Sequence, residues 1–216
     1  MATRISGHLR RLPMKLFAES FLLAYAAARI AETFWIRPKL RGQIICRYSF
    51  PILVSAYITF YLTVLTGVFA NDGPMSSVVL STGVAVVLTS LVGRNWSIKT
   101  LGVFHSIHIE IRHQHLWVEA GPYGFVRNPY YLSNLIEAFG LALISSGRRP
   151  LAILCLIYLP SLMHRLIVEE RAHKANFPGT FEAYCMRVPA LIPNCLCDWI
   201  VRLRARKVSS RSFSHE

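Results

Sequence analysis

The sequence predicts an all-α, polytopic membrane protein with about five transmembrane helices. Only 16% of its 216 residues are charged and 53% are hydrophobic, giving a mean hydropathy of +0.39. Ordinary soluble domains carry about 25% charged residues. The chain also contains several nearly uncharged runs close to the roughly 20 residues that a helix needs to cross a bilayer. Composition and run length together favour the membrane class.

Four of these runs are the clearest candidate spans. Residues 50–70 form a run of 21 without a charged side chain, and residues 74–92 are also uncharged. Residues 130–146 are apolar apart from Asn134 and Glu137, and residues 150–168 are apolar until His164 and Arg165. We expect each run to be a membrane helix.

The first candidate span is less regular. Residues 16–36 carry Glu19, Arg29 and Glu32, so this segment could cross the membrane or lie in its interface. We expect it to span. Basic residues precede it, as in a signal peptide, but no small-residue cleavage site follows a short apolar core, so we expect a retained helix.

Short turns and basic residues predict how the spans are arranged. The turns 71–73 and 147–149 are tight and should join antiparallel helical hairpins. With the N-terminus outside, the inner segments hold 17 Lys and Arg residues and the outer segments hold 6. Loop 93–129 and the tail that follows the last span are therefore expected to share the cytoplasmic side.

The net charge and the cysteines exclude some classes of function. The +13 charge arises mainly from loops and the tail, which favours anionic lipid over nucleic acid as a partner. Five cysteines show no zinc-binding spacing, so free thiols in a reducing compartment are expected. Histidines gather near residue 115, but few carboxylates accompany them, and no metal site is predicted.

The segment 115–134, HLWVEAGPYGFVRNPYYLSN, interrupts the apolar pattern with turn residues. Gly121-Pro122 and Asn128-Pro129 are turn dipeptides. Pro129 suits the first turn of the next helix, with Asn128 as its N-cap. Glycines at 121 and 124 would let the backbone approach a ligand closely.

The helix that follows this segment carries polar residues on one face. Tyr130, Asn134 and Glu137 recur at i, i+4 and i+7. A carboxylate inside a span is costly and usually faces a cavity or a partner. Two readings of Glu137 stay open: a functional group, or a structural pair with a neighbouring helix.

A second motif, residues 164–193, lies where the last span leaves the membrane. Arg165 and Glu169 form an i, i+4 pair, Glu170 follows, and a turn comes at 177–179. Charge pairs of this kind are commonly solvated and contribute little. The motif is informative mainly in combination with the first one.

Together the two motifs resemble the isoprenylcysteine carboxyl methyltransferase family and its phospholipid N-methyltransferase relatives. The resemblance covers about 80 residues, with a helical hairpin between the two blocks. The matching residues of the first block are His115, Leu116, Val118, Gly121, Pro122, Tyr123, Val126, Arg127, Asn128, Pro129 and Tyr131. Those of the second block are Arg165, Glu169, Glu170, Phe177, Phe181, Tyr184, Val188, Pro189, Ile192 and Pro193.

The resemblance implies a membrane-embedded methyltransferase that depends on S-adenosylmethionine. It implies a cytosolic cofactor pocket, closed by the segment after the last span, and a lipophilic acceptor that enters from the lipid. Residues 1–93 would then hold the first three helices, 94–195 the methyltransferase core with hairpin 130–168, and 196–216 a basic tail. Gly124, Asn128 and Ser133 depart from common family residues, so the family name does not identify the acceptor.

The resemblance also implies roles for individual residues. The catalytic candidates, which would orient the acceptor or pair with it, are Arg127, Asn128, Arg165 and Glu169. The residues that would form the cofactor wall or contact it are His115, Gly121, Pro122, Tyr123, Val126, Tyr131 and Glu170. An amine or thiol acceptor would need a base, with Glu169 or Glu137 as candidates, whereas a carboxylate would not.

Two other functions remain open at this stage. One is a membrane reductase of similar topology that uses a nicotinamide cofactor. The other is a non-catalytic membrane scaffold that has kept the fold. The Arg165-Glu169-Glu170 match favours methyl transfer over the reductase, whereas the departures at Gly124 and Ser133 keep the scaffold open.

Overall fold

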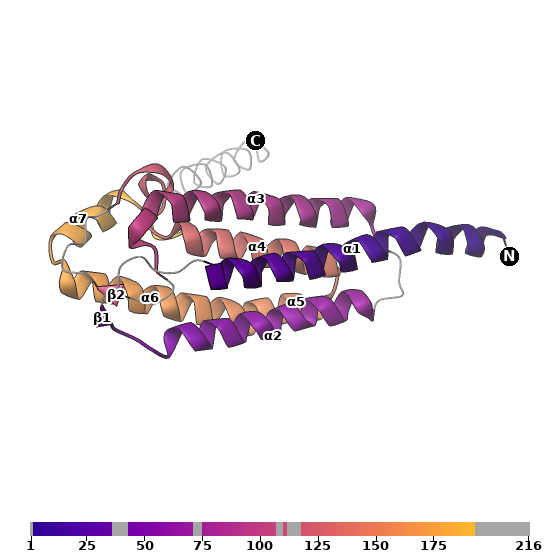
Figure 1. The fold of residues 1–216 in the computed structure, drawn as a ribbon, viewed down its shortest axis with the longest axis horizontal. Helices are drawn as coiled ribbons and strands as arrows, with labels where there is room; N and C mark the ends of the chain where they lie inside the picture. Colours follow the sequence, from indigo (N-terminus) through magenta and orange to yellow (C-terminus); the bar gives the residue numbers. More distant parts are fainter. Residues whose placement is uncertain (1, 36–42, 71–74, 107–109, 112–117, 193–216) are drawn as a thin grey trace, which may run out of the picture.

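The computed structural model describes residues 2–35, 43–70, 75–106, 110–111 and 118–192. Its long helices run beside one another as an elongated bundle (Figure 1). They are α1 (Ala2–Trp35), α2 (Ser49–Phe69), α3 (Ser77–Leu101), α4 (Pro129–Ser145) and a continuous stretch made of α5 (Arg148–Ile153), the π-helical η3 (Leu154–Tyr158) and α6 (Leu159–Asn176). The shorter elements are η1 (Gly102–Phe104), η2 (Gly121–Gly124), α7 (Thr180–Arg187), β1 (Gln43–Ile44) and β2 (Glu110–Ile111).

The all-α membrane fold expected from the sequence is confirmed. Three helical stretches in the described part of the chain are long and apolar enough to cross a membrane, namely Ser49–Phe69, Ser77–Phe104 and Arg148–Asn176. The run 130–146 forms α4, which has 17 residues. Spanning by α4 and by α1 stays a prediction, and so does the total of about five spans.

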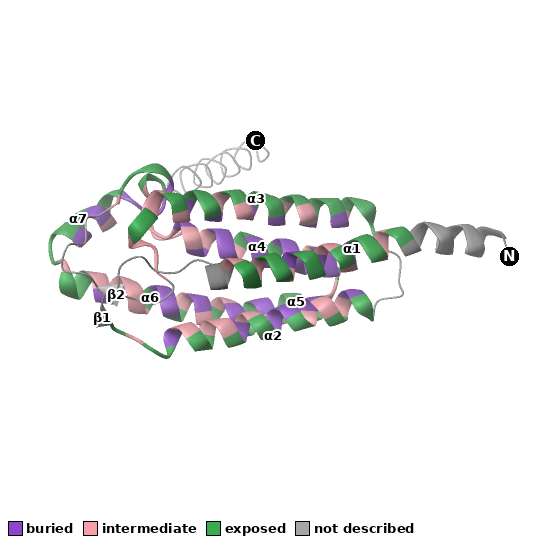
Figure 2. Ribbon diagram, in the orientation of Figure 1, coloured by how far each residue is buried: buried purple, intermediate pink, exposed green. Residues whose placement is uncertain are grey.

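Exposed apolar side chains cover the outer surface of the bundle. Leu156 is 75% exposed and Val78 is 70% exposed, although both lie in helices long enough to span. Figure 2 shows exposed residues on the outward surfaces of the helices and buried residues toward the centre. Such a surface is unfavourable in water and suits contact with lipid chains.

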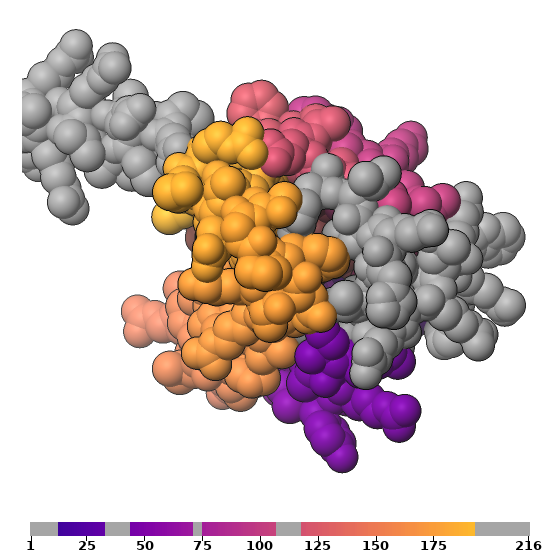
Figure 3. Space-filling model, turned by 90° about the vertical axis from the view of Figure 1, so that its left-hand side faces the viewer, coloured from indigo at the N-terminus to yellow at the C-terminus, as the bar shows by residue number. Residues whose placement is uncertain are grey.

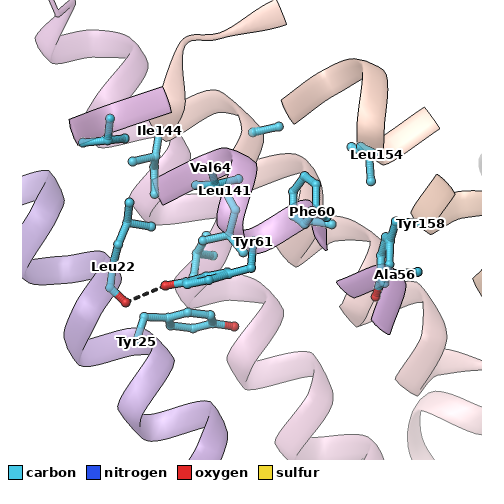
Figure 4. Close-up of a cluster of buried hydrophobic side chains, with 14 of the residues drawn as sticks. Leu22, Tyr25, Ala56, Phe60, Tyr61, Val64, Leu141, Ile144, Leu154 and Tyr158 are labelled. Carbon is cyan, nitrogen blue, oxygen red and sulfur yellow. Dashed lines mark hydrogen bonds between the residues drawn. The ribbon is translucent and has the colours of Figure 1, made fainter. Parts of the chain in front are cut away.

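The central core joins α1, α2, α3, α4 and the η3–α6 stretch. Figure 4 shows Leu22, Phe60, Leu141 and Tyr158 among its buried side chains. The Tyr61 hydroxyl donates a hydrogen bond of 2.5 Å to the Leu22 carbonyl, which ties α2 to α1. A polar group buried in such a core must find a partner inside the protein.

Helices α3 and α4 approach each other most closely where both have glycine. A Cβ atom on Gly83 would lie 2.9 Å from the Gly140 carbonyl oxygen, and one on Gly140 would lie 3.0 Å from the Gly83 carbonyl oxygen. Small residues allow helix backbones to pack tightly in membranes. This contact fixes α4 against α3 along the side of the bundle.

The predicted start of the loop at residue 93 is wrong, because α3 continues to Leu101. Arg94 resembled the charged end of a span in the sequence. Its side chain is only 1% exposed, however, and it binds carboxylates inside the bundle. A buried partner therefore allows the helix to continue through a charged residue.

One end of the bundle gathers the connecting segments. There β1 and β2 pair antiparallel, with Gln43 opposite Ile111, and link the segment before α2 to the one after α3. Helix α7 lies at the same end (Figure 1). Both sequence motifs also fall there.

Candidate active site at one end of the bundle

The two motifs meet at this end and are joined through their backbones. Figure 3 views the end directly, with the orange and yellow residues of α6 and α7 against the red residues around η2. The Arg127 amide donates to the Pro189 carbonyl at 2.8 Å, and the Asn128 amide donates to the Ala190 carbonyl at 3.1 Å. The Tyr184 hydroxyl donates to the Tyr123 carbonyl at 2.7 Å. The segment after α6 thus folds back onto the segment before α4.

Glu170 holds this junction together. Its carboxylate accepts hydrogen bonds from Arg127 Nε at 3.1 Å, from Arg127 Nη2 at 3.3 Å and from Asn128 Nδ2 at 3.0 Å. Arg127 Nη1 donates to the carbonyls of Val188 at 2.6 Å and Cys185 at 3.2 Å. A two-pronged guanidinium–carboxylate pair of this kind is among the stronger polar contacts. It fixes α6, η2 and the end of α7 relative to one another.

Asn128 stands at the predicted N-cap position of α4, but its side chain makes no capping hydrogen bond. The amide instead donates to Glu170 and to the Ala190 carbonyl, at 3.0 and 3.2 Å. These two bonds orient the Asn128 carboxamide by its Nδ2 donor, whereas a cap would need its Oδ1 to accept from a helix N–H group. The predicted cap is therefore wrong in its hydrogen bonding and right in its position.

Tyr131 links Arg165 to Glu169. Its hydroxyl accepts a hydrogen bond of 2.9 Å from Arg165 Nε and donates one to Glu169 Oε2. Arg165 also donates to Ser49 Oγ at 3.2 Å and lies over the Phe50 ring, 5.8 Å from its centroid. Arg165 is only 4% exposed, so the solvated surface pair that the spacing allowed is replaced by a buried polar cluster.

Aromatic rings gather around Glu169. Its Oε1 lies 3.9 Å from His173 Nε2, and the His173 ring lies 5.7 Å from that of Phe181. Burial raises the pKa of Tyr123 above its ordinary range, and the neighbouring Glu169 carboxylate raises it further. A carboxylate among aromatic faces is suited to hold a cation such as a sulfonium. The Glu169 carboxylate and the rings near it therefore fit the positively charged cofactor that the resemblance implies.

The predicted cofactor-wall residues of η2 pack against α3. Gly121 has a positive φ of 57°, and a Cβ atom there would lie 3.1 Å from Thr100 Oγ1 and 3.2 Å from Trp96 Nε1. Pro122 and Val126 are buried. We expected the backbone at Gly121 to approach a ligand closely, and in the structure it approaches α3 instead. His115 lies outside the described residues.

Glu137 has partners, as the structural reading of the sequence required. It binds Arg94, accepts a hydrogen bond of 2.7 Å from the Tyr57 hydroxyl and lies 3.5 Å from Arg29 Nε. Both arginines also bind the Glu32 carboxylate, Arg94 at 2.9 Å and Arg29 at 2.8 Å. The signal for this network was present in the sequence, because charges inside spans usually pair with one another.

Sequence reasoning missed Ser49 and His173 in the site. Ser49 is buried at the start of α2 and receives the Arg165 hydrogen bond. His173 follows Glu169 by one helical turn, a spacing visible in the sequence. Within the described residues, no three His, Cys, Asp or Glu side chains lie close enough together to hold a metal ion.

Comparison with known proteins confirms the resemblance seen in the motifs. Residues 82–174 match the family described as "Isoprenylcysteine carboxyl methyltransferase (ICMT) family". This segment is isoprenylcysteine carboxyl methyltransferase-like. The matched range contains the first block and the Arg165-Glu169-Glu170 motif, and it ends before α7. The family match supports a membrane methyltransferase.

A curated relative is similar over part of its length. The chain is 31% identical over 140 residues to the cobalt-zinc-cadmium resistance protein CzcN of Cupriavidus metallidurans. The match covers 63% of this chain and 60% of that relative. The chain therefore spans less than two thirds of the relative that it matches.

Proposed function

We propose that this protein is an integral membrane methyltransferase that uses S-adenosylmethionine and acts on a lipophilic or membrane-delivered acceptor. The site would face the cytoplasm, within a core of residues 94–195 whose first residues belong to α3. One observation carries the proposal: the two family motifs interlock at the bundle end through Tyr131, Arg165 and Glu169, and through Arg127, Asn128 and Glu170.

The residues of the site have distinct proposed tasks. When bound, S-adenosylmethionine supplies an electrophilic methyl group. Glu169 and the nearby rings would offset the positive charge, and the η2 segment with Tyr131 would form the wall. His115 would contribute a further polar contact. Glu170 would act by holding Arg127 and Asn128 in place. Positioning of this kind can contribute about 7–11 kcal/mol to a displacement reaction.

The charges of the site also bear on the acceptor. A carboxylate acceptor would already be ionised, and Arg165 would attract it. An amine or thiol acceptor would have to lose a proton. Glu169 is then the better base, because it lies among the family motifs at the bundle end, whereas two arginines hold Glu137 inside the bundle.

The test is the binding of S-adenosylmethionine, which carries the sulfonium charge, to detergent-purified protein, measured by calorimetry. We would compare the wild type with Glu169→Gln, which keeps the shape of the side chain and removes its charge. Replacing Glu170 with alanine would also release Arg127 and Asn128, so it is the less specific change. Glu182→Gln is the matched control, because Glu182 is an exposed carboxylate on α7.

We expect saturable binding of S-adenosylmethionine that Glu169→Gln weakens by about ten-fold or more, or about 1.4 kcal/mol, with Glu182→Gln unchanged. Folded wild-type protein that does not bind would contradict the methyltransferase proposal. Titration with a nicotinamide cofactor would then separate the two remaining functions, since a reductase would bind it and a scaffold would not.

A further inference from the structure

A column of polar side chains runs down one face of α4 from the site into the bundle. Tyr131 contacts Arg165 and Glu169 at the top, and Glu137 lies at the bottom. Asn134 lies between them, three residues from each. Residues three or four apart on a helix are surface neighbours, with Cβ atoms about 5–6 Å apart. Asn134 is therefore one turn deeper in the bundle than Tyr131.

The bottom of this column is polar, but its charges are already matched. Glu137 and Glu32 face Arg94 and Arg29 in one network, and Tyr57 donates a further hydrogen bond to Glu137. The Glu137 side chain is fully buried and that of Arg94 is 1% exposed. A second charged group placed here would disturb a balanced, desolvated cluster. The network thus suits a neutral polar neighbour.

Asn134 carries a side-chain oxygen that has no hydrogen-bond partner among the described residues. It is 5% exposed, and its Oδ1 makes no hydrogen bond within the described part of the structure. Buried polar side chains in native proteins nearly always have a partner, and a missing one calls for an explanation. Glu137 and Tyr131, one turn away on either side, are both hydrogen-bonded.

We propose that Asn134 binds an uncharged hydrogen-bond donor of the methyl acceptor, such as an amide N–H or a hydroxyl. This group would lie about one helical turn, or roughly 5 Å, from the methyl-accepting atom, on the side of the hydrocarbon tail. The Oδ1 atom of Asn134 is a hydrogen-bond acceptor without a net charge, which matches an uncharged donor on the ligand. The inference rests on the proposed function, because it takes the reacting end of the acceptor to lie at Tyr131 and Glu169.

The test uses three amphiphiles with a dodecanoyl tail: dodecanoylglycine, N-dodecanoyl ethylenediamine and N-dodecanoyl cysteamine. They carry a carboxylate, an amine or a thiol close to an amide. Each is compared with the plain alkyl acid, amine or thiol of equal length. The readouts are thermal stabilisation of the detergent-purified protein and, where methyl transfer occurs, KM and kcat. The variants are Asn134→Leu and, as a smaller change that also removes the carboxamide, Asn134→Ala.

We expect at least one amide probe to bind about ten-fold more tightly than its plain partner. Asn134→Leu should abolish this preference while leaving S-adenosylmethionine binding unchanged. Equal binding of amide and plain probes, a preference that persists in Asn134→Leu, or no stabilisation by any probe would overturn the inference. If Asn134→Leu does not fold, loss or persistence of the preference in Asn134→Ala decides in the same way.

The two proposals fail in different ways. Binding of S-adenosylmethionine without an amide preference removes the inference and keeps the methyltransferase. An amide preference that depends on Asn134, without S-adenosylmethionine binding, keeps the lipid-group site and removes the methyltransferase.

Discussion

At the scale of single residues, the site depends on side chains that bond in two directions. The Tyr131 hydroxyl accepts from Arg165 and donates to Glu169, and so fixes a cation and a carboxylate with one oxygen. Arg127 likewise divides its guanidinium between Glu170 and two backbone carbonyls. Each of these residues sits in a family motif, but the motif alone does not indicate which atoms meet.

Tyr184 gives a prediction that depends on pH. Burial raises the pKa of its phenol from an ordinary value of 10.0 to about 12, and nearby Glu119 adds to the effect. A raised pKa in the folded state means that the stabilisation is complete below pH 10 and is lost as pH rises toward 12. The loss reaches at most about 2–3 kcal/mol.

The measurement is the thermal unfolding of wild type and Tyr184→Phe at about pH 9 and about pH 11. Wild type should lose more stability between the two values than the variant, because the other tyrosines titrate equally in both proteins. The variant should be the less stable protein at the lower pH, since it lacks the hydrogen bond to the Tyr123 carbonyl. Parallel loss in both proteins would show that Tyr184 is not the group that titrates.

At the scale of elements, the contact between α3 and α4 depends on Gly83. A Cβ atom there would lie 2.7 Å from Ile144 Cγ1 and 2.9 Å from the Gly140 carbonyl oxygen. Backbone cannot move aside easily, so we expect Gly83→Ala to destabilise the protein by about 1–3 kcal/mol. Thermal unfolding in detergent measures the effect.

Gly67→Ala on α2 is the control for this substitution. A Cβ atom at Gly67 would lie 3.3 Å from its nearest neighbour, the Ser145 hydroxyl. Alanine is favoured over glycine in a helix by about 1 kcal/mol, so this variant should be unchanged or slightly more stable. A Gly83→Ala protein as stable as Gly67→Ala would refute the tight crossing.

The sequence could predict elements better than their ends. Uncharged runs located α2, most of α3 and the η3–α6 stretch, because a bilayer demands such runs. The end of α3 was misplaced since Arg94 looks like a boundary until its distant partner Glu137 is known. The motifs predicted that residues 115–134 and 164–193 would meet, but the bonds of Asn128 and Ser49 depend on segments brought together only by folding.

At the scale of the whole molecule, one buried charge network joins four helices. Arg29 and Glu32 come from α1, Tyr57 from α2, Arg94 from α3 and Glu137 from α4. Its charges balance, and it lies below the site on the same face of α4 as Tyr130. The network therefore sets how the helices that carry the site are arranged.

This balance predicts the outcome of a double-mutant experiment. Arg94→Met should destabilise the protein by about 3–5 kcal/mol, because it leaves the buried Glu137 with too little positive charge. Adding Glu137→Leu should recover much of the loss, since Arg29 and Glu32 remain paired with each other at 2.8 Å. Thermal unfolding and the yield of monodisperse protein provide the measurement.

Arg187→Met serves as the control, because its pair with Glu119 is exposed and should contribute no more than about 1 kcal/mol. If the double variant is destabilised by the sum of its single variants, the two side chains are not coupled. The four helices would then be held together by apolar packing and glycine contacts alone, and α4 would owe its position to Gly83 and Gly140. If the double variant instead recovers stability, an unbalanced buried charge, and not lost packing, is what destabilises Arg94→Met.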